Sequence, residues 1–104
     1  MGSAVIDRSS VAALTDEAAT RRLDPAATAW RLVDGDVLGL DLQTEEYFVI
    51  KGSGVALWSR MADGATDEEL AGLLSERYDL PLERARTDVA AFVDTLRRRG
   101  FVAP

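Results

Sequence analysis

Apolar residues alternate with polar ones between residues 30 and 42, and this period of two predicts β-strands. A first strand runs through Trp30 and Leu32. The dipeptide Asp34-Gly35 then predicts a tight hairpin, because both central residues of a type I′ turn need positive φ. The second strand carries an apolar residue at every second position, so we expect one buried face, made by Leu38, Leu40 and Leu42.

The third predicted strand, Tyr47–Ile50, is apolar at four consecutive positions and follows a polar turn at 43–46. Both of its faces are apolar, unlike those of the strand before it. As the last strand of a three-stranded meander, it has an open edge with unpaired N–H and C=O groups. Two interpretations stay open. The edge docks an extended peptide as an added strand, or the strand is buried on both faces by helices or by the N-terminal segment.

A helical period of three to four residues replaces the strand period after residue 52. The first predicted helix begins with Ser53 as its N-cap. The second begins at a capping box, in which threonine at the cap is followed three residues later by glutamate (Thr66 and Glu69). The third begins at Pro81, and its continuous apolar stripe comprises Ala85, Val89, Phe92, Val93 and Leu96.

Three strands followed by three helices predict an α+β fold with the order βββααα, in which the three strands form an antiparallel sheet. With 104 residues, the chain has room for one modest core. Residues 1–25 are polar and alanine-rich and have no sustained apolar stripe, so we expect a flexible N-terminal tail. The ordered domain is predicted at 26–104.

The composition excludes most catalytic chemistry. The chain has no cysteine and no histidine, which removes disulfides, thiolate nucleophiles, imidazole bases and the commonest zinc ligands. The glycines at 52 and 54 lack the lysine of a phosphate-binding loop. We therefore expect no enzymatic activity, no cofactor and no metal.

Charge and hydropathy narrow the range of partners. With 18 acidic residues against 12 basic ones, the net charge is −6, which argues against nucleic acid because duplex binding relies on a basic surface. No apolar run approaches the roughly 20 residues that cross a bilayer. The N-terminus has no secretory signal pattern. We expect a cytoplasmic protein without a membrane partner.

The stripe of the last helix also has two interpretations. On the plainer one, Val89, Phe92, Val93 and Leu96 are core residues. On the other, the rim of the stripe stays exposed beside the open strand edge and forms a groove wall. The three arginines at 97–99 end this helix, where their positive charge interacts favourably with the negative end of the helix dipole. We interpret them as dipole partners rather than phosphate contacts.

Several motifs in a fixed order resemble the PqqD-like family, the precursor-peptide recognition elements of ribosomal natural-product (RiPP) pathways. The resemblance covers roughly residues 28 to 102, with an aromatic strand, GSGVALW, DGATDEEL, and DVAAFVDTL leading to GFV. It implies a winged-helix-like βββααα domain without activity of its own. In the family, a leader peptide pairs with the third strand, and its apolar side chains lie between that strand and the third helix. The implied leader-peptide binding residues are Tyr47, Phe48, Val49, Ile50, Lys51, Val89, Phe92, Val93 and Leu96.

The resemblance also implies partners. The chain is most similar to the stand-alone recognition proteins of lasso peptide pathways, so we expect it to bind a precursor leader peptide and deliver it to a leader peptidase or another modifying enzyme. The family often has Leu-Asn where this chain has Ile50-Lys51, and the lysine either favours an acidic leader or is plain surface. A winged-helix DNA-binding regulator is the alternative function. A homodimer through the open strand edge is the alternative use of that edge.

Overall fold

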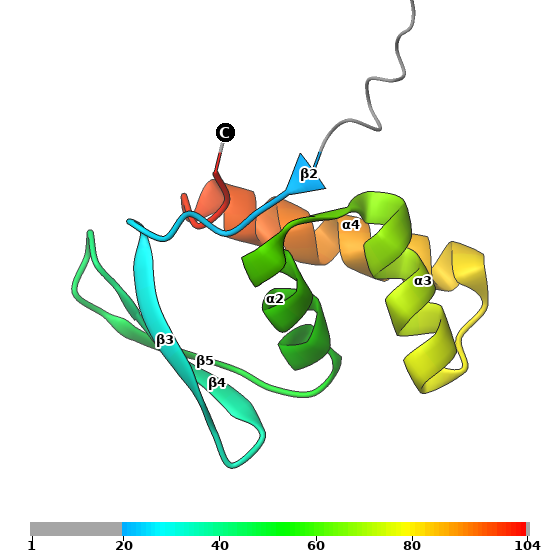
Figure 1. Ribbon diagram of the computed structural model, residues 1–104, viewed down its shortest axis with the longest axis horizontal. Coiled ribbons are helices and arrows are strands. Elements are labelled where there is room, and N and C mark those ends of the chain that lie inside the picture. Colours follow the sequence, from blue (N-terminus) through cyan, green and yellow to red (C-terminus); the bar gives the residue numbers. More distant parts are fainter. Residues whose placement is uncertain (1–19, 104) are drawn as a thin grey trace, which may run out of the picture.

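The structure is a computed structural model that describes residues 20–103, and Figure 1 shows its elements. In chain order they are β2 (Thr20–Arg21), β3 (Thr28–Val33), β4 (Asp36–Asp41), β5 (Tyr47–Ile50), α2 (Ser53–Asp63), β6 (Ala65–Thr66), α3 (Asp67–Tyr78) and α4 (Leu82–Arg98). This order confirms the predicted α+β class, with a three-stranded antiparallel sheet followed by three helices. The short strands β2 and β6 form a separate pair. The winged-helix comparison stays a prediction.

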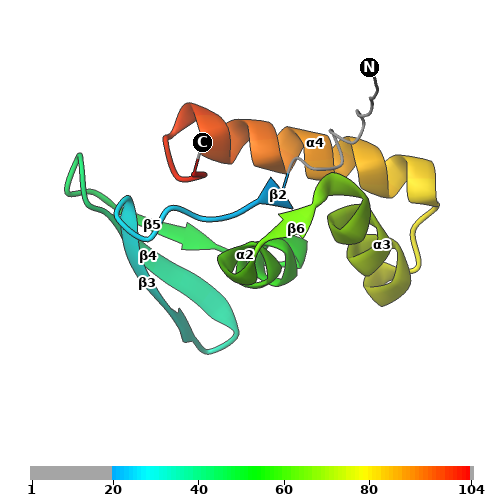
Figure 2. The same cartoon turned by 45° about the horizontal axis from the view of Figure 1, so that its top comes forward.

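The sheet has the order β3-β4-β5, and both pairings are antiparallel. The hairpin between β3 and β4 turns at Asp34 and Gly35, whose φ angles of 52° and 84° confirm the expected positive values. Figure 2 shows α2 between the sheet and α3, with α4 lying above them in this view. Helix α3 packs against both α2 and α4.

Trp58 of α2 occupies the centre of the core and is fully buried. Between ring centroids, it lies 5.8 Å from Trp30 of β3, 5.5 Å from Phe48 of β5 and 6.1 Å from Phe101 after α4. Aromatic pairs of this kind add about 0.5–1.5 kcal/mol each beyond the area that they bury. One side chain therefore ties both outer strands of the sheet and the C-terminal segment to α2.

The prediction of which face of β4 is buried is wrong. The structure buries Val37, Gly39 and Asp41, while the three leucines lie on the other face, half-buried or exposed. The reason lies at Gly39, because the ring of Phe48 from the neighbouring strand covers this residue and occupies the space of a side chain. The inner face of β4 is therefore marked by a glycine and an aspartate rather than by its most apolar residues.

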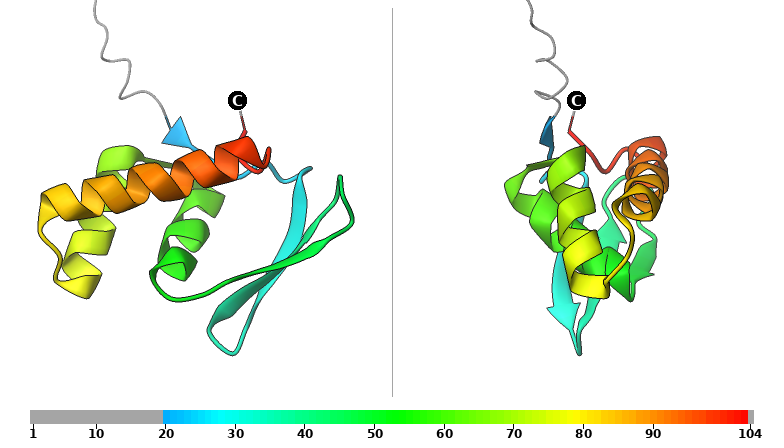
Figure 3. Two further views of the ribbon diagram at one scale, coloured as in Figure 1. Left: turned by 180° about the vertical axis from the view of Figure 1, so that it is seen from behind. Right: turned by 90° about the vertical axis from the view of Figure 1, so that its right-hand side faces the viewer.

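Residues 20–25 fall inside the predicted tail, but they pack on the domain beside the C-terminal segment (Figure 3). Strand β2 pairs antiparallel with β6, and the Leu23 N–H donates to the Met61 carbonyl at 3.0 Å. The Leu23 side chain is buried, and its backbone bridges to Val102. Because Leu23 completes the core, the packed unit includes residues that a boundary at 26 leaves out. Residues 1–19, the rest of the predicted tail, lie outside the described residues.

Local signals set the helix starts. Thr66 Oγ1 accepts from the Glu69 N–H at 3.1 Å, and Glu69 Oε1 accepts from the Thr66 N–H at 2.9 Å, which confirms the predicted capping box. The N-cap of α2 is Gly52, with φ of 63°, rather than the predicted Ser53, which is the first helical residue. Positive φ favours glycine, so the turn from β5 into α2 depends on Gly52.

Gly39→Ala tests the packing of Phe48 on the sheet. The added Cβ would overlap the ring of Phe48, so we expect the free energy of unfolding in urea to fall by about 1–3 kcal/mol. Gly72→Ala is the control, since a Cβ added there in α3 meets no atom within 4 Å. That control should raise stability by about 0.5–1 kcal/mol. Equal effects of the two substitutions would contradict the packing.

Candidate functional site

The hydrogen bonds between β4 and β5 alternate along the strands. The Asp41 N–H donates to the Glu46 carbonyl at 2.9 Å at the start of this ladder. In an antiparallel pair, every second residue exchanges its N–H and C=O bonds with the partner strand. Given the register, in which Gly39 lies opposite Phe48, the residues of β5 that bond to β4 are Phe48 and Ile50.

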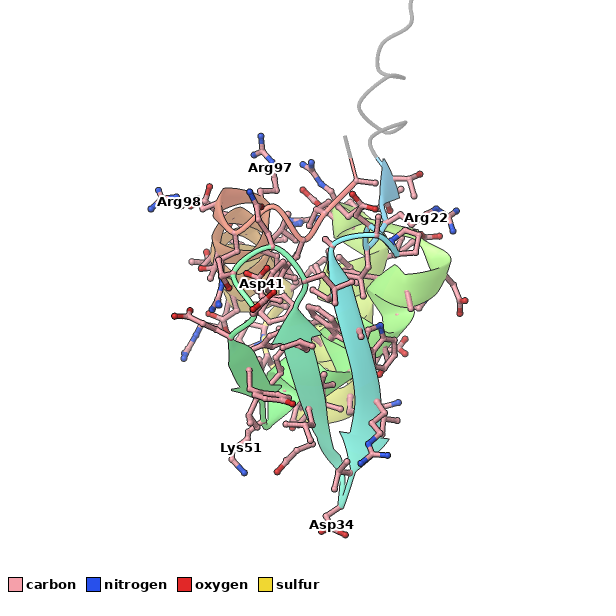
Figure 4. All side chains as sticks on the ribbon, turned by 90° about the vertical axis from the view of Figure 1, so that its left-hand side faces the viewer. Arg22, Asp34, Asp41, Lys51, Arg97 and Arg98 are labelled. Carbon is pink, nitrogen blue, oxygen red and sulfur yellow. The ribbon has the colours of Figure 1, made fainter. Side chains whose placement is uncertain are left out.

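The other two residues of β5 face the open edge. The N–H and C=O groups of Tyr47 and Val49 point away from β4, and within residues 20–103 no strand pairs with β5 on that side. Their side chains lie on the outer face of the sheet, where Tyr47 is 75% exposed and Val49 is 53% exposed. Within residues 20–103, burial of this strand on both faces by helices is therefore contradicted, while the segment before residue 20 lies outside the described residues. Figure 4 shows β5 at the margin of the sheet, on the side of α4.

The inner side chains of β5 lie against α2 and α4. Phe48 and Ile50 are half-buried. A Cβ built on Gly54 would lie 2.9 Å from Ile50 Cγ2 and 3.1 Å from Phe92 Cε1, so both side chains meet over this glycine. The φ of Gly54 is not positive, and glycine is needed there for space rather than for backbone conformation. The contact places Phe92 of α4 beside the end of β5.

A second contact fixes how α4 runs along β5. The guanidinium carbon of Arg99 lies 5.8 Å from the centroid of the Phe48 ring. An α-helix has about 3.6 residues per turn, so Phe92, Thr95 and Arg99 share one side of α4. We call these three residues the α4 flank. Since Phe92 lies at Ile50 and Arg99 lies at Phe48, α4 runs antiparallel to β5, and the flank faces the strand along its length.

The structure separates the four predicted residues of the groove wall. Val89, Val93 and Leu96 are buried in the core, at 1%, 3% and 4% exposure. Only Phe92 is half-buried and lies at the boundary with β5. The three buried residues therefore pack α4 against the core and do not line the space beside β5. The apolar stripe identified the core side of the helix, and the flank lies about a quarter turn away from it.

The arginines at the end of α4 have different environments. Arg98 pairs with Asp94 at 3.0 Å, and Figure 4 shows Arg97 and Arg98 directed away from the helix end. Arg99 instead lies over two rings, 5.8 Å from Phe48 and 5.1 Å from Phe101. Sequence reasoning grouped the three as dipole partners. The signal it missed was the helical spacing that puts Arg99 in line with Phe92.

Lys51, the last predicted residue of the strand, forms an ion pair. Its Nζ lies 2.7 Å from Asp36 Oδ2 at the start of β4. In Figure 4 the side chain points away from the end of β5 opposite to the α4 arginines. Exposed pairs of this kind contribute about 0.2–1 kcal/mol. The positive charge of Lys51 is thus compensated within the sheet.

Asp41 holds the turn that leads into β5. Its carboxylate accepts from the N–H of Gln43 at 2.9 Å and of Thr44 at 3.2 Å. The hydrogen bond from Gln43 is the largest cause that holds the pKa of Asp41 below its usual value. Burial opposes this shift. The hydrogen bond from Thr44 and the positive charge of Arg99 reinforce it. The next turn residue, Glu45, adopts a left-handed conformation with φ of 64°. The carboxylate thereby fixes where β5 begins.

The outer face of the sheet is apolar and carries a hollow. Its volume is about 370 Å³, and its lining residues come from all three strands: Ala29, Trp30, Arg31, Leu38, Gly39, Leu40 and Tyr47. The exposed Tyr47 and Val49 continue this face to the open edge. An added strand would therefore meet apolar side chains on the outer face as well as the inner one.

Residues 20–103 offer no assembled metal site, because nowhere among them do three or more histidine, cysteine, aspartate or glutamate side chains gather. Each helix in this part of the chain is too short or too polar to cross a membrane.

The fold and the site define a small α+β domain with one open sheet edge lined by the flank of a helix. The sequence model of coenzyme PQQ synthesis protein D (PqqD) matches residues 37–102, which is more than half of the chain. The chain belongs to the PqqD family. The match runs from the central strand of the sheet through α4. No curated protein matches the sequence.

Two solved structures share the fold. TbiB1 in complex with the TbiA(beta) leader peptide has a TM-score of 0.72 and 23% identity, with 78% of this chain and 93% of that chain covered. A lasso peptide synthetase B1 complexed with the leader peptide has a TM-score of 0.70 and 26% identity, with 81% and 98% covered. The two matches thus span nearly the whole length of both solved chains.

Asp41→Asn tests the carboxylate that holds the β4–β5 turn. The unfolded-state pKa of aspartate is about 3.9, and the folded-state pKa is lower. The stabilisation is therefore complete at neutral pH and is lost as the pH falls below about 4 through the folded-state pKa. Urea unfolding should find the wild type more stable than the variant at pH 7, with the difference shrinking toward pH 2. A difference independent of pH would contradict this role.

Proposed function

We propose that this protein binds the leader segment of a ribosomally made precursor peptide and delivers it to a modifying enzyme or leader peptidase, without catalysis of its own. The observation that carries the proposal is the open edge of β5, where the backbone groups of Tyr47 and Val49 have no partner strand within residues 20–103 and lie beside the α4 flank. An extended peptide that adds a strand here gains main-chain hydrogen bonds for affinity and side-chain contacts for specificity.

The register of β5 dictates how such a peptide would lie. We call this added peptide the guest. Its residues opposite Tyr47 and Val49 would exchange backbone hydrogen bonds with them and place their side chains on the outer face of the sheet. Guest residues opposite Phe48 and Ile50 would direct their side chains inward, toward the α4 flank. The guest would therefore need side chains that fit the space beside the α4 flank at every second position. Different peptide sequences can meet this requirement.

Membership of the PqqD family and the two solved relatives support the proposal. Both relatives are complexes with a leader peptide, and one of them is lasso peptide synthetase B1. The absence of cysteine and histidine from the sequence supports a role in binding rather than catalysis. A lasso peptide pathway is the setting that these relatives favour.

A second copy of the chain is the competing occupant of the edge. Two β5 strands would pair by the same backbone groups, so homodimer and peptide complex would exclude each other. The net charge of −6 opposes self-association. We therefore propose that the dimer, if it forms at high concentration, dissociates when peptide is added.

Val49→Pro tests the docking edge. Proline removes the outward N–H of Val49 but leaves the bonds of Phe48 and Ile50 to β4 in place. Fluorescence polarisation with a fluorescently labelled candidate leader peptide should find affinity lowered about tenfold or more. Circular dichroism should find the fold retained.

Leu32→Pro is the matched control. Leu32 lies on β3, the opposite outer strand, and its side chain is 56% exposed. The Leu42 N–H donates to the Ala27 carbonyl at 3.0 Å. From this pair onward every second residue of β3 bonds to β4, so the Leu32 N–H faces away from β4. This proline therefore blocks the other outer edge of the sheet, which lies away from α4. Unchanged affinity in Val49→Pro, or equal losses in the two variants, would contradict docking on β5.

A further inference from the structure

We infer that Arg99 is a specificity-determining residue that selects an acidic side chain in the bound peptide, two residues after an apolar one. The inference rests on the proposed function and adds a sequence requirement to it. It comes from the chemistry of the α4 flank, which changes along the length of β5. The apolar stripe of α4 gives no hint of this requirement, because its buried members do not face the strand.

The flank is apolar at one end and cationic at the other. Phe92 meets Ile50 over Gly54, so a guest side chain directed inward at this end would contact an aromatic ring and an aliphatic side chain. At the other end, Arg99 lies over Phe48, and Thr95 is the exposed residue between the two. The two inward positions of a guest therefore meet different chemistry.

Arg99 is held in place and retains hydrogen-bonding capacity. The rings of Phe48 and Phe101 lie 5.8 Å and 5.1 Å from its guanidinium carbon, an arrangement that orients the plane of the guanidinium group. Within residues 20–103, no carboxylate lies at ion-pair distance from Arg99, whereas Arg98 pairs with Asp94. Asp41 is the nearby acid whose pKa responds to Arg99. Its oxygens accept the N–H groups of the β4–β5 turn, which leaves Arg99 available to a guest.

The register fixes the spacing of the two selected residues. In a guest antiparallel to β5, the residue opposite Ile50 comes first and the residue opposite Phe48 follows two positions later. These two positions are about 6.6 Å apart along a strand, and both side chains point inward. Arg99 follows Phe92 by seven residues, about 10 Å along the helix axis. Because side chains on a helix lean toward its N-terminus, the guanidinium group of Arg99 reaches back over Phe48.

Peptide selection on the full chain tests the inference without a known leader. A display library of random segments is selected in parallel on the wild type, Arg99→Gln, Arg98→Gln and Val49→Pro. Sequences that Val49→Pro also recovers are discarded, so the remainder bind through the β5 edge. Arg98→Gln is the matched control. It removes the same positive charge at the neighbouring position, where the side chain pairs with Asp94 and does not lie over Phe48. Circular dichroism verifies that each variant is folded.

We expect edge-dependent peptides from the wild type and from Arg98→Gln to carry aspartate or glutamate two residues after an apolar position. Arg99→Gln should retain the apolar preference and lose the acidic one. For a selected peptide, changing the acid to its amide should weaken binding to the wild type about fivefold, and should leave binding to Arg99→Gln unchanged.

Two failures are distinguishable. Edge-dependent peptides without an acidic preference, or an equal loss of that preference in Arg98→Gln, would overturn the role of Arg99 and leave leader capture standing. If no recovered peptide depends on Val49, docking on β5 fails, and the role of Arg99 falls with it.

Discussion

The open edge of β5, at which residues 20–103 supply no partner strand for the backbone groups of Tyr47 and Val49, is the constraint around which the rest of the domain is built. A strand edge binds an added strand more tightly when it is already rigid, because the cost of ordering it would otherwise oppose association. Three features supply that rigidity. Phe48 is fixed between the sheet and Trp58, Asp41 holds the turn before the strand, and the positive φ of Gly52 directs the chain into α2 after it. The core of the domain thus presents a short strand in a defined position.

An open edge also carries a hazard, because it accepts any extended chain, including another copy. The protein limits this hazard by sequence on either side of the strand. Glu45 and Glu46 precede it and Lys51 follows it, so charge borders an edge that is apolar only over β5. The strand is short and the net charge of −6 disfavours self-association. On the proposed function, the α4 flank would add selection, since a bound peptide would contact the side chains of Phe92 and Arg99 as well as the backbone of β5.

The sequence predicted the elements well because their signals are local. The Asp34-Gly35 hairpin and the capping box at Thr66 depend on conformational preferences that a few neighbouring residues determine. The face of β4 and the composition of the α4 flank depend on contacts between distant segments, and there the prediction was wrong or incomplete. Alternation alone favours burial of leucines, but the ring of Phe48 needs a glycine beneath it. Likewise, the apolar stripe of α4 identifies its core side, and of the three flank residues it includes Phe92 but neither Thr95 nor Arg99. DNA binding stays an alternative without a structural observation in its favour.

Amide hydrogen exchange along β5 tests the central claim most directly, because it reports on individual backbone N–H groups. In the free protein, Phe48 and Ile50 should be protected by their bonds to β4, while Tyr47 and Val49 exchange rapidly. Saturating leader peptide should protect Tyr47 and Val49 as well. Protection of all four amides in the free protein, or rapid exchange at Tyr47 and Val49 in the complex, would contradict the account.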